Sequence, residues 1–464
     1  MAARSLSTRK GSKAHEQSSL SPKVSKKTLG GTIIFAVGVL SVLQFLISLS
    51  LINHDPPPQQ SNGGSSIDAA IDKTNPNYRD PNSGNSNIGA TTRRCTPDQL
   101  AIVEAQLPPA DCRRHKNSPW SQRCSFSYAT QCPDAMWLDE LYKKRHREKR
   151  KSGGFTAIFV GCNKGMDAVD TLRMGSGDPV FDKAAWRNAM TKGGQISLDN
   201  SVCNQANLPQ FELSSGDEDS ATNDEQRRGK STAQVHCIEP MPITAEALSN
   251  SARDLQWDTH GFVVTHAAIA REDGITPFPS GKSVGKENKG MENCKNGADG
   301  VNCVNVDMYS LDTYVEKFLP REDGSGRIID FLSIDVEGFD MDVMLGGSST
   351  LKNRVHYLEF EYNWMGSWKN QKLSDSIRLL DEEYDFTCYW PGYDGNIWRI
   401  TDCWLDYYDL HFWANVACVK RGVKEVEDMA ERMEELFQKT LDKGSNLVMD
   451  YEHRGVTYQY ARTS

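Results

Sequence analysis

The chain has 464 residues, of which 38% are hydrophobic, and 53 basic against 62 acidic side chains give a formal net charge of −9. This length allows one large domain with additional segments, or two domains. The acidic balance argues against a protein that binds nucleic acid through a basic surface. Twelve cysteines indicate an oxidising compartment, where disulfides form and persist.

An uncharged apolar run occupies residues 29–52. About 20 apolar helical residues cross a bilayer core, and this run is longer than the apolar core of a cleaved signal peptide, which is one alternative beside a buried helix. Seven basic residues and one acidic residue precede it, so the positive-inside rule places the N-terminus in the cytosol. We predict a cytoplasmic tail at 1–28, a transmembrane signal anchor at 29–52 and a lumenal remainder that holds every cysteine.

Two segments of different composition follow the anchor. Residues 53–92 are rich in proline, asparagine, serine and glycine, which predicts a flexible stem. Residues 93–152 predict a cysteine-containing lumenal stem subdomain. Its four cysteines are Cys95, Cys112, Cys124 and Cys132. Four cysteines allow three disulfide pairings, and the sequence does not choose among them. They lack the C-x2-C spacing that would favour a zinc site. The basic run at 143–151 is interpreted as a solvated helix end or, alternatively, as a contact for an acidic glycan.

A strand followed by a glycine turn opens the next region. Residues 155–160 (FTAIFV) predict a buried strand, and a helix is expected at 166–174. Between them lie Gly161 and Gly165, which allow close approach of backbone to a ligand, and the N–H groups that begin the helix are free to bind an anion. The spacing alone is a weak signal and differs from the G-x-G-x-x-G of dinucleotide-binding turns.

Further predicted strands end in polar residues. The strand at 234–238 leads to Glu239, whose carboxylate suits the hydroxyl groups of a ribose. A strand at 261–265 leads to His266 and to Ala268, which is small enough to border an adenine ring.

The most informative run, 328–340, is an apolar strand that ends in Asp335 and Glu337, and a fifth strand at 355–361 ends in Glu361. Strands that alternate with helices predict an α/β fold with helices on both faces of the sheet, and such sheets bind ligands at the carboxyl ends of their strands. We therefore expect these carboxylates to gather at the ligand edge.

The order of these motifs resembles the FkbM family of methyltransferases. The resemblance covers residues 153–422, and the stretch D-F-L-x-I-D-V-E-G at 330–338 is its most specific part. It is carried by 160–165 (VGCNKG), 238–240 (IEP), 266–270 (HAAIA), 310–315 (SLDTYV), 329–347 (IDFLSIDVEGFDMDVMLGG) and 358–361 (LEFE). The resemblance implies a Rossmann-like class I methyltransferase sheet, S-adenosylmethionine as cofactor, and usually O-methylation.

The resemblance also implies roles for particular residues. Residues at the cofactor would be Gly161, Asn163, Gly165, Glu239 and Ala268. Asp335 and Glu337 would lie where cofactor and acceptor meet. Two positions depart from the family's pattern: Phe159 stands where an acid is usual, and Ser333 where a lysine is frequent.

Methyl transfer requires a hydroxyl aligned with the methyl group and a base that removes its proton. We predict Asp335 or Glu337 as this base, ahead of His266 and Glu361. Either of the first two carboxylates has an alternative structural role, Glu337 as a charge at a helix start. No metal ligand set is predicted.

Insertions and a C-terminal extension complete the predicted domain. A helix near the acceptor is expected at 181–190, and an acidic unstructured loop at 213–231. A second loop insertion at 272–302 would be closed by a Cys294–Cys303 disulfide. The aromatic stretch 386–418 is interpreted as core or, alternatively, as a surface that stacks on sugar rings. Residues 423–464 predict an amphipathic helix, at 424–443, and a tail.

Topology and resemblance together predict a membrane-bound O-methyltransferase of the Golgi lumen with a glycan hydroxyl as acceptor. One alternative is a non-catalytic binding module with the same fold, which the two departures from the family's pattern, at Phe159 and Ser333, favour. The other is a glycosyltransferase. Its D-x-D metal motif occurs twice, as Asp217-Glu218-Asp219 and as Asp340-Met341-Asp342, and the second match falls inside a predicted helix, where residues two apart do not face each other.

Overall fold

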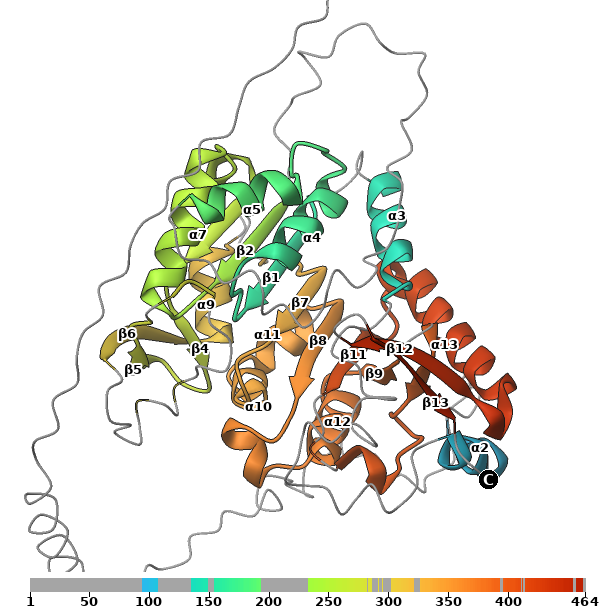
Figure 1. Ribbon diagram of the computed structural model, residues 1–464. Coiled ribbons are helices and arrows are strands. Elements are labelled where there is room, and N and C mark those ends of the chain that lie inside the picture. The colour runs from blue at the N-terminus through green and yellow to red at the C-terminus, as the bar shows by residue number, and fades with distance from the viewer. Residues whose placement is uncertain are drawn as a thin grey trace, which may run out of the picture. The chain divides into compact units, whose positions relative to one another are not determined.

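A computed structural model of the chain (Figure 1) describes residues 94–106, 135–148, 154–192, 233–281, 283–285, 291, 294, 302–320, 326–392, 395–409, 411, 414–453 and 456–461. All of them lie within one compact unit, residues 89–464. The predicted tail, anchor and flexible stem, and the acidic loop at 213–231, lie outside the described residues. Among the helices that are described, none is long and apolar enough to span a bilayer.

An eight-stranded sheet in the order β10-β9-β11-β8-β7-β1-β2-β3 is the centre of the unit. The five strands from β3 to β8 in this order run parallel to their neighbours, whereas β11 lies antiparallel between β8 and β9, and β10 is antiparallel to β9. This mixed, mostly parallel sheet confirms the predicted α/β fold. Its strands are β1 Thr156–Val160, β2 Gln234–Ile238, β3 Phe262–Thr265, β7 Phe331–Ile334, β8 Tyr357–Tyr362, β9 Phe386–Pro391, β10 Ile397–Arg399 and β11 Ala414–Lys420.

Strand β1 lies where the order of the strands reverses. Its sequence TAIFV is buried at every position, as expected for a parallel strand covered on both faces. The chain runs from β1 outward to β2 and β3, and then returns to place β7 on the other side of β1. Such a switch point leaves a crevice at the carboxyl ends of the two central strands, where open α/β sheets bind ligands.

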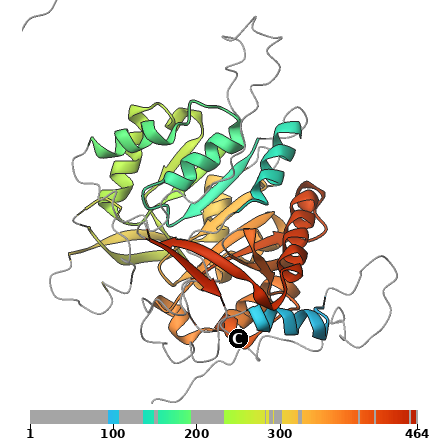
Figure 2. The same cartoon turned by 45° about the vertical axis from the view of Figure 1, so that its right-hand side comes forward.

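Helices cover both faces of the sheet (Figures 1 and 2). On one face, α3 packs Tyr142 against Phe155 with 5.8 Å between ring centroids, and α13 places Glu434 on Tyr389 of β9. On the other face, Tyr314 of α9 bonds to His236 of β2 at 3.1 Å. The helices are α2 Pro97–Gln106, α3 Leu138–Glu148, α4 Met166–Ser176, α5 Lys183–Thr191, α7 Pro242–Asp254, α9 Leu311–Phe318, α10 Asp340–Leu345, α11 Ser348–Asn353, α12 Leu373–Glu382 and α13 Glu427–Asp442.

Two smaller sheets accompany the main one. One has the order β4-β6-β5, with β4 Ala268–Ala270, β5 Gly274–Pro279 and β6 Cys303–Ser310, and the other is the hairpin of β12 Val448–His453 and β13 Val456–Ala461. The insertion at 272–302 was predicted to be a loop, but part of it forms β5, which pairs along β6. The predicted disulfide between Cys294 and Cys303 is confirmed.

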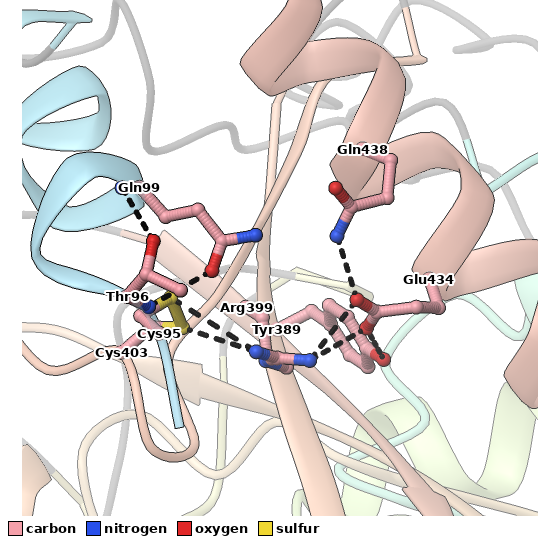
Figure 3. The surroundings of a disulfide bond; sticks show 8 residues. All are labelled: Cys95, Thr96, Gln99, Tyr389, Arg399, Cys403, Glu434 and Gln438. Carbon is pink, nitrogen blue, oxygen red and sulfur yellow. Dashed lines mark hydrogen bonds and ion pairs between the residues drawn. A yellow bond between two sulfur atoms is a disulfide. The ribbon is translucent and has the colours of Figure 1, made fainter. Parts of the chain in front are cut away.

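The segment 93–152 is not a separate subdomain where it is described. The prediction that Cys95 pairs within this segment is wrong, because its partner is Cys403, 308 residues away (Figure 3). At the end of α2, the buried amide of Gln106 donates to the carbonyl oxygens of Thr440 and Gly444 and accepts from the indole of Trp398. These bonds attach the segment to the C-terminal part of the domain.

Within the basic run 143–151, Lys144 and Arg145 are not solvated, whereas the side chains of 146–151 lie outside the described residues. Lys144 is 9% exposed and donates to the carbonyl oxygen of Lys424. Arg145 pairs with Asp330, which is 1% exposed and also accepts from the backbone N–H of Thr156. A buried carboxylate needs such partners, so Arg145 holds α3 against the start of β1. Lys144 instead attaches α3 to Lys424 and Asp428.

Several aromatic side chains in the stretch 386–418 are fully buried and belong to the core. The largest such side chains are Trp390, Trp398 and Tyr408, each at most 1% exposed. Stacking of these rings on a sugar is therefore excluded. Cys388 and Cys418 join the neighbouring strands β9 and β11 beneath them.

Candidate functional site

The glycine turn joins the end of β1 to α4. The backbone N–H groups of Gly161 and Cys162 both donate to the carbonyl oxygen of Ile238, each at 3.0 Å. Gly161 has a φ of +84°, and a Cβ there would lie 1.8 Å from the carbonyl oxygen of Asp335. Only glycine permits so close a contact, so this position draws the ends of β1, β2 and β7 together.

Gly165 lies where a side chain would contact two other residues too closely. It has a φ of +70°, and a Cβ there would lie 2.9 Å from Leu248 and 3.2 Å from Trp186. Trp186 of α5 is fully buried and donates its indole N–H to the carbonyl oxygen of Lys164 at 2.8 Å. The helix expected near the acceptor therefore exists, as α5, and it supports the glycine turn. Contact of either glycine with a cofactor stays a prediction.

Glu239 follows β2 and ties the turn to it. Its Oε2 accepts the backbone N–H of Asn163 at 2.9 Å, and its Oε1 accepts that of Met241 at 2.8 Å. The side chain is 7% exposed, and this burial raises the pKa of Glu239 to about 7 despite the two hydrogen bonds. Each carboxylate oxygen has a second lone pair, so Glu239 can still accept from a ribose hydroxyl while it holds the turn.

A disulfide joins the same two elements. Cys162 in the turn is bonded to Cys237 on β2, and the pair is 9% and 0% exposed. The bond encloses 75 residues of chain, so it removes much of the freedom that the turn would have in its absence. The sequence does not predict this pair, because a strand cysteine and a turn cysteine carry no spacing signal.

The end of β7 carries the two predicted catalytic carboxylates. Asp335 is exposed and donates its backbone N–H to the carbonyl oxygen of Val160 at 2.9 Å, beside Gly161. Glu337 has a φ of +57°, and Asn163 in the turn has a φ of +49°. This conformation is uncommon for residues with a side chain and costs roughly 1 kcal/mol or more. Two such residues therefore lie at neighbouring strand ends, which is typical of a functional site.

Two buried carboxyl groups lie behind them. Asp340 is fully buried at the start of α10, which raises its pKa to about 8. Glu361 near the end of β8 is 6% exposed, and burial together with the charges of Asp335, Asp340 and Glu337 holds its pKa well above the ordinary range. Asn363 donates to Glu361 at 2.6 Å. The predicted gathering of carboxylates at the ends of β7 and β8 is therefore observed.

Other predicted residues are placed differently. His266 is exposed, and its Nε2 lies 3.1 Å from the carbonyl oxygen of Pro240. Ala268 is 4% exposed inside β4, where it is in register with Met308, and its contact with a cofactor stays a prediction. Of the D-x-D match in α10, Asp340 is buried and Asp342 pairs with Arg271 at 3.6 Å. The two carboxylates of that match therefore have separate surroundings, which speaks against a shared metal ion.

Glu359 is a further acidic residue near these strand ends, and the sequence predicts no role for it. It is partly exposed in the middle of β8, and Tyr357 donates its hydroxyl hydrogen to Glu359 Oε1. The only signal in the sequence is a glutamate inside an otherwise apolar strand, next to the better-placed Glu361.

These residues fit S-adenosylmethionine. Its ribose matches the buried acceptor at Glu239, and its positive sulfonium matches the exposed carboxylate of Asp335. The turn at Gly161 keeps β1 and β7 close enough for one ligand to lie across both. The arrangement provides hydrogen-bond acceptors and negative charge, as a cationic nucleoside requires.

Comparison with known proteins gives one family match and one structural match. Residues 205–388 match the model of the methyltransferase FkbM domain. A crystal structure titled as methyltransferase FkbM from Methylobacillus flagellatus KT matches with 11% sequence identity and a TM-score of 0.27. The match covers 57% of this chain and 43%, less than half, of that structure's chain. No curated protein matches the sequence.

The family match supports a methyltransferase FkbM domain over residues 205–388. Domains of this family use S-adenosylmethionine, so the prediction of this cofactor and of an S-adenosylmethionine-dependent methyltransferase is confirmed at the level of the family. The matched range begins after the glycine turn, and thus Gly161, Asn163 and Gly165 precede it.

Proposed function

We propose that the chain transfers a methyl group from S-adenosylmethionine to a hydroxyl group at the carboxyl ends of β1, β7 and β8. The observation that carries this proposal is the convergence of the turn at Gly161, the buried acceptor at Glu239 and the carboxylates around Asp335 at the switch point of the sheet. The bound cofactor supplies an electrophilic methyl group, so the protein needs to supply alignment and a proton acceptor.

The residues divide these tasks by position. Glu239 and Asn163 hold the nucleoside end, because they lie at the end of β2 and in the turn beside it. Asp335 and Glu337 lie at the end of β7, next to Gly161. Asp335 is exposed, so it can take the proton of an acceptor hydroxyl, whereas the raised pKa of Asp340 leaves that carboxyl largely protonated at neutral pH.

We further propose that this reaction takes place in the lumen of the Golgi, on a glycan hydroxyl, in a single-pass type II membrane protein. The apolar run at 29–52 and the basic residues before it support the membrane topology. The disulfides among the described residues support an oxidising compartment; they are Cys95–Cys403, Cys162–Cys237, Cys294–Cys303 and Cys388–Cys418.

Calorimetric titration of the full-length, detergent-solubilised protein with S-adenosylmethionine and S-adenosylhomocysteine tests the cofactor site, and both are expected to bind. Mass spectrometry of glycans from cells lacking the protein is expected to show the loss of a methyl increment. Asp335→Asn is expected to lower turnover by roughly 100-fold at unchanged S-adenosylhomocysteine affinity, whereas the exposed control Asp307→Asn should leave both unchanged. A folded protein that binds neither ligand would contradict the proposal.

A non-catalytic binding module remains the second candidate. Phe159 is 7% exposed and packs edge-on against Phe331, with 5.4 Å between ring centroids, so no acid stands at that position of β1. This candidate predicts that Asp335→Asn and Glu337→Gln rescue cells lacking the protein as well as the wild type does.

A further inference from the structure

One row of side chains crosses the sheet beneath the proposed site. Phe159 of β1 is in register with Ser333 of β7, and Ser333 is in register with Glu359 of β8. Residues in register on neighbouring strands point to the same face. Asp335 and Glu361 follow two positions later on that face, at the carboxyl ends of the same strands. Glu359 therefore lies one step below the proposed site rather than in the distant core.

Two buried residues hold Glu359 from below. Tyr357, fully buried, donates its hydroxyl hydrogen to Glu359 and accepts the indole N–H of Trp137 at 2.7 Å. Trp137 is 1% exposed and lies just before α3, in a segment that the FkbM domain match does not include. The Trp137–Tyr357 pair thus fixes one oxygen of the carboxylate, while the side chain of Glu359 keeps partial exposure.

The surroundings of Glu359 contain negative charge but no paired cation. Among the residues that the structure describes, no lysine, arginine or histidine forms an ion pair with it, and its charged neighbour is Asp167 of α4. The residues beside it in register, Ser333 and Ala417, are uncharged. Burial raises the pKa of Glu359 to about 7. A positive group placed here would relieve the cost of burying this carboxyl.

The spacing of the strands indicates which positive group fits. Glu239 at β2 and Glu359 at β8 are separated by β1 and β7, which places their strands about 14 Å apart at about 4.8 Å per strand. A ligand whose ribose lies at Glu239 and which crosses the turn at Gly161 then brings its far end to β8.

We propose that Glu359 binds the ammonium group of the methionine portion of S-adenosylmethionine. Trp137 and Tyr357 are then positioning residues for the carboxylate of Glu359. This inference rests on the proposed function, because it assumes that the cofactor occupies the strand ends. It assigns to Glu359 the negative charge that Phe159 does not provide, and it makes the segment before the family domain part of the cofactor site.

Two ligands separate this role from a general effect on the fold. S-adenosylhomocysteine carries the amino-acid portion, whereas 5′-methylthioadenosine lacks it. In calorimetric titrations of the full-length protein, Glu359→Gln is expected to weaken S-adenosylhomocysteine binding by on the order of 10- to 100-fold, as for loss of a charge-assisted hydrogen bond. Binding of 5′-methylthioadenosine should change by less than about twofold. Tyr357→Phe should weaken S-adenosylhomocysteine binding by a smaller factor in the same selective way.

The exposed Glu431→Gln serves as the matched control, and its affinities for both ligands should equal those of the wild type. Unchanged S-adenosylhomocysteine affinity in Glu359→Gln, or an equal loss for both ligands, would overturn the inference and leave the proposed function standing. A wild-type protein that binds neither ligand would overturn the proposed function and this inference together.

Discussion

The carboxylate of Glu239 accepts the backbone N–H of Asn163 at 2.9 Å, across the ends of two neighbouring strands. Cys162, one residue before Asn163, forms a disulfide with Cys237, two residues before Glu239. The turn that follows β1 is therefore held to β2 by one hydrogen bond and one covalent bond. Both contacts lie where the cofactor's ribose is proposed to bind, so they should affect affinity as well as stability.

Replacement of Glu239 by Gln should weaken this attachment. An amide offers one acceptor where the carboxylate offers two, so either the N–H of Asn163 or that of Met241 loses its partner. We expect a loss of about 1–3 kcal/mol in the free energy of unfolding, and weaker S-adenosylhomocysteine binding. Denaturant unfolding and calorimetry measure the two effects. The exposed Glu246→Gln on α7 is the control, and equal results for both variants would contradict the role given to Glu239.

Loss of the Cys162–Cys237 disulfide should also affect both properties. The double variant Cys162→Ser with Cys237→Ser is expected to lose about 2–4 kcal/mol of stability, because a loop of 75 residues is no longer closed. Affinity for S-adenosylhomocysteine should fall with it. The matched control removes Cys294 and Cys303, whose disulfide has a sequence separation of 9, and it should lose less stability. A disulfide variant with wild-type affinity would show that the turn keeps its form without the bond.

Asp340 should give the protein a pH-dependent stability. Its pKa is raised by burial from 3.8 to about 8 in the folded chain, so the folded state binds the additional proton between these values. The stabilisation is complete below about pH 4 and is lost as the pH rises through about 8. Asp340→Asn does not titrate, and its melting temperature relative to the wild type should therefore rise from pH 5 to pH 9. The exposed Asp307→Asn serves as the control. A difference for Asp340→Asn that does not change with pH would contradict this prediction.

Arg399 should be important for the attachment of the N-terminal segment (Figure 3). Its Nη1 bonds to both carboxylate oxygens of Glu434 at 3.0 Å, and its Nη2 lies 3.5 Å from the sulfur of Cys403, which is bonded to Cys95. Arg399→Met is expected to cost about 2 kcal/mol, less than for a fully buried pair because Glu434 is partly exposed. Arg432→Met removes the exposed pair with Glu435 and should cost under about 0.5 kcal/mol. Chemical denaturation of both variants tests the difference.

Local patterns predicted most of the central elements. The strand expected at 234–238 is β2, and the helix expected at 166–174 is α4, which extends two residues further. The strand is predictable from the sequence because burial on both faces requires an apolar run. The helix is predictable because Gly165 marks its start. The carboxylates after β7 were predicted for the same reason, since a polar residue directly after a buried strand reaches the edge of the sheet.

Contacts between distant segments were not predictable in this way. Cys95 was expected to pair with a nearby cysteine, yet it pairs with Cys403, because α2 lies beside the C-terminal helix in the folded chain (Figure 2). The sequence favours a solvated position for the basic residues of α3, whereas Arg145 pairs with Asp330, which directly precedes β7. A sequence does not state which segments will be neighbours, so it leaves the partners of cysteines and charges open.

The amino-acid sequence by itself determined the α/β class, the glycine turn, and the acidic ends of the strands at Glu239, Asp335 and Glu361, because each depends on hydrophobic runs and turn residues that are local in the chain. Tertiary structure alone decided the strand register that puts Glu359 beside Ser333, the bond from Trp137 to Tyr357, and the burial that raises the pKa of Glu239, Asp340 and Glu359. The physical reason is that register, partners and desolvation arise only when segments far apart in the sequence exclude water together.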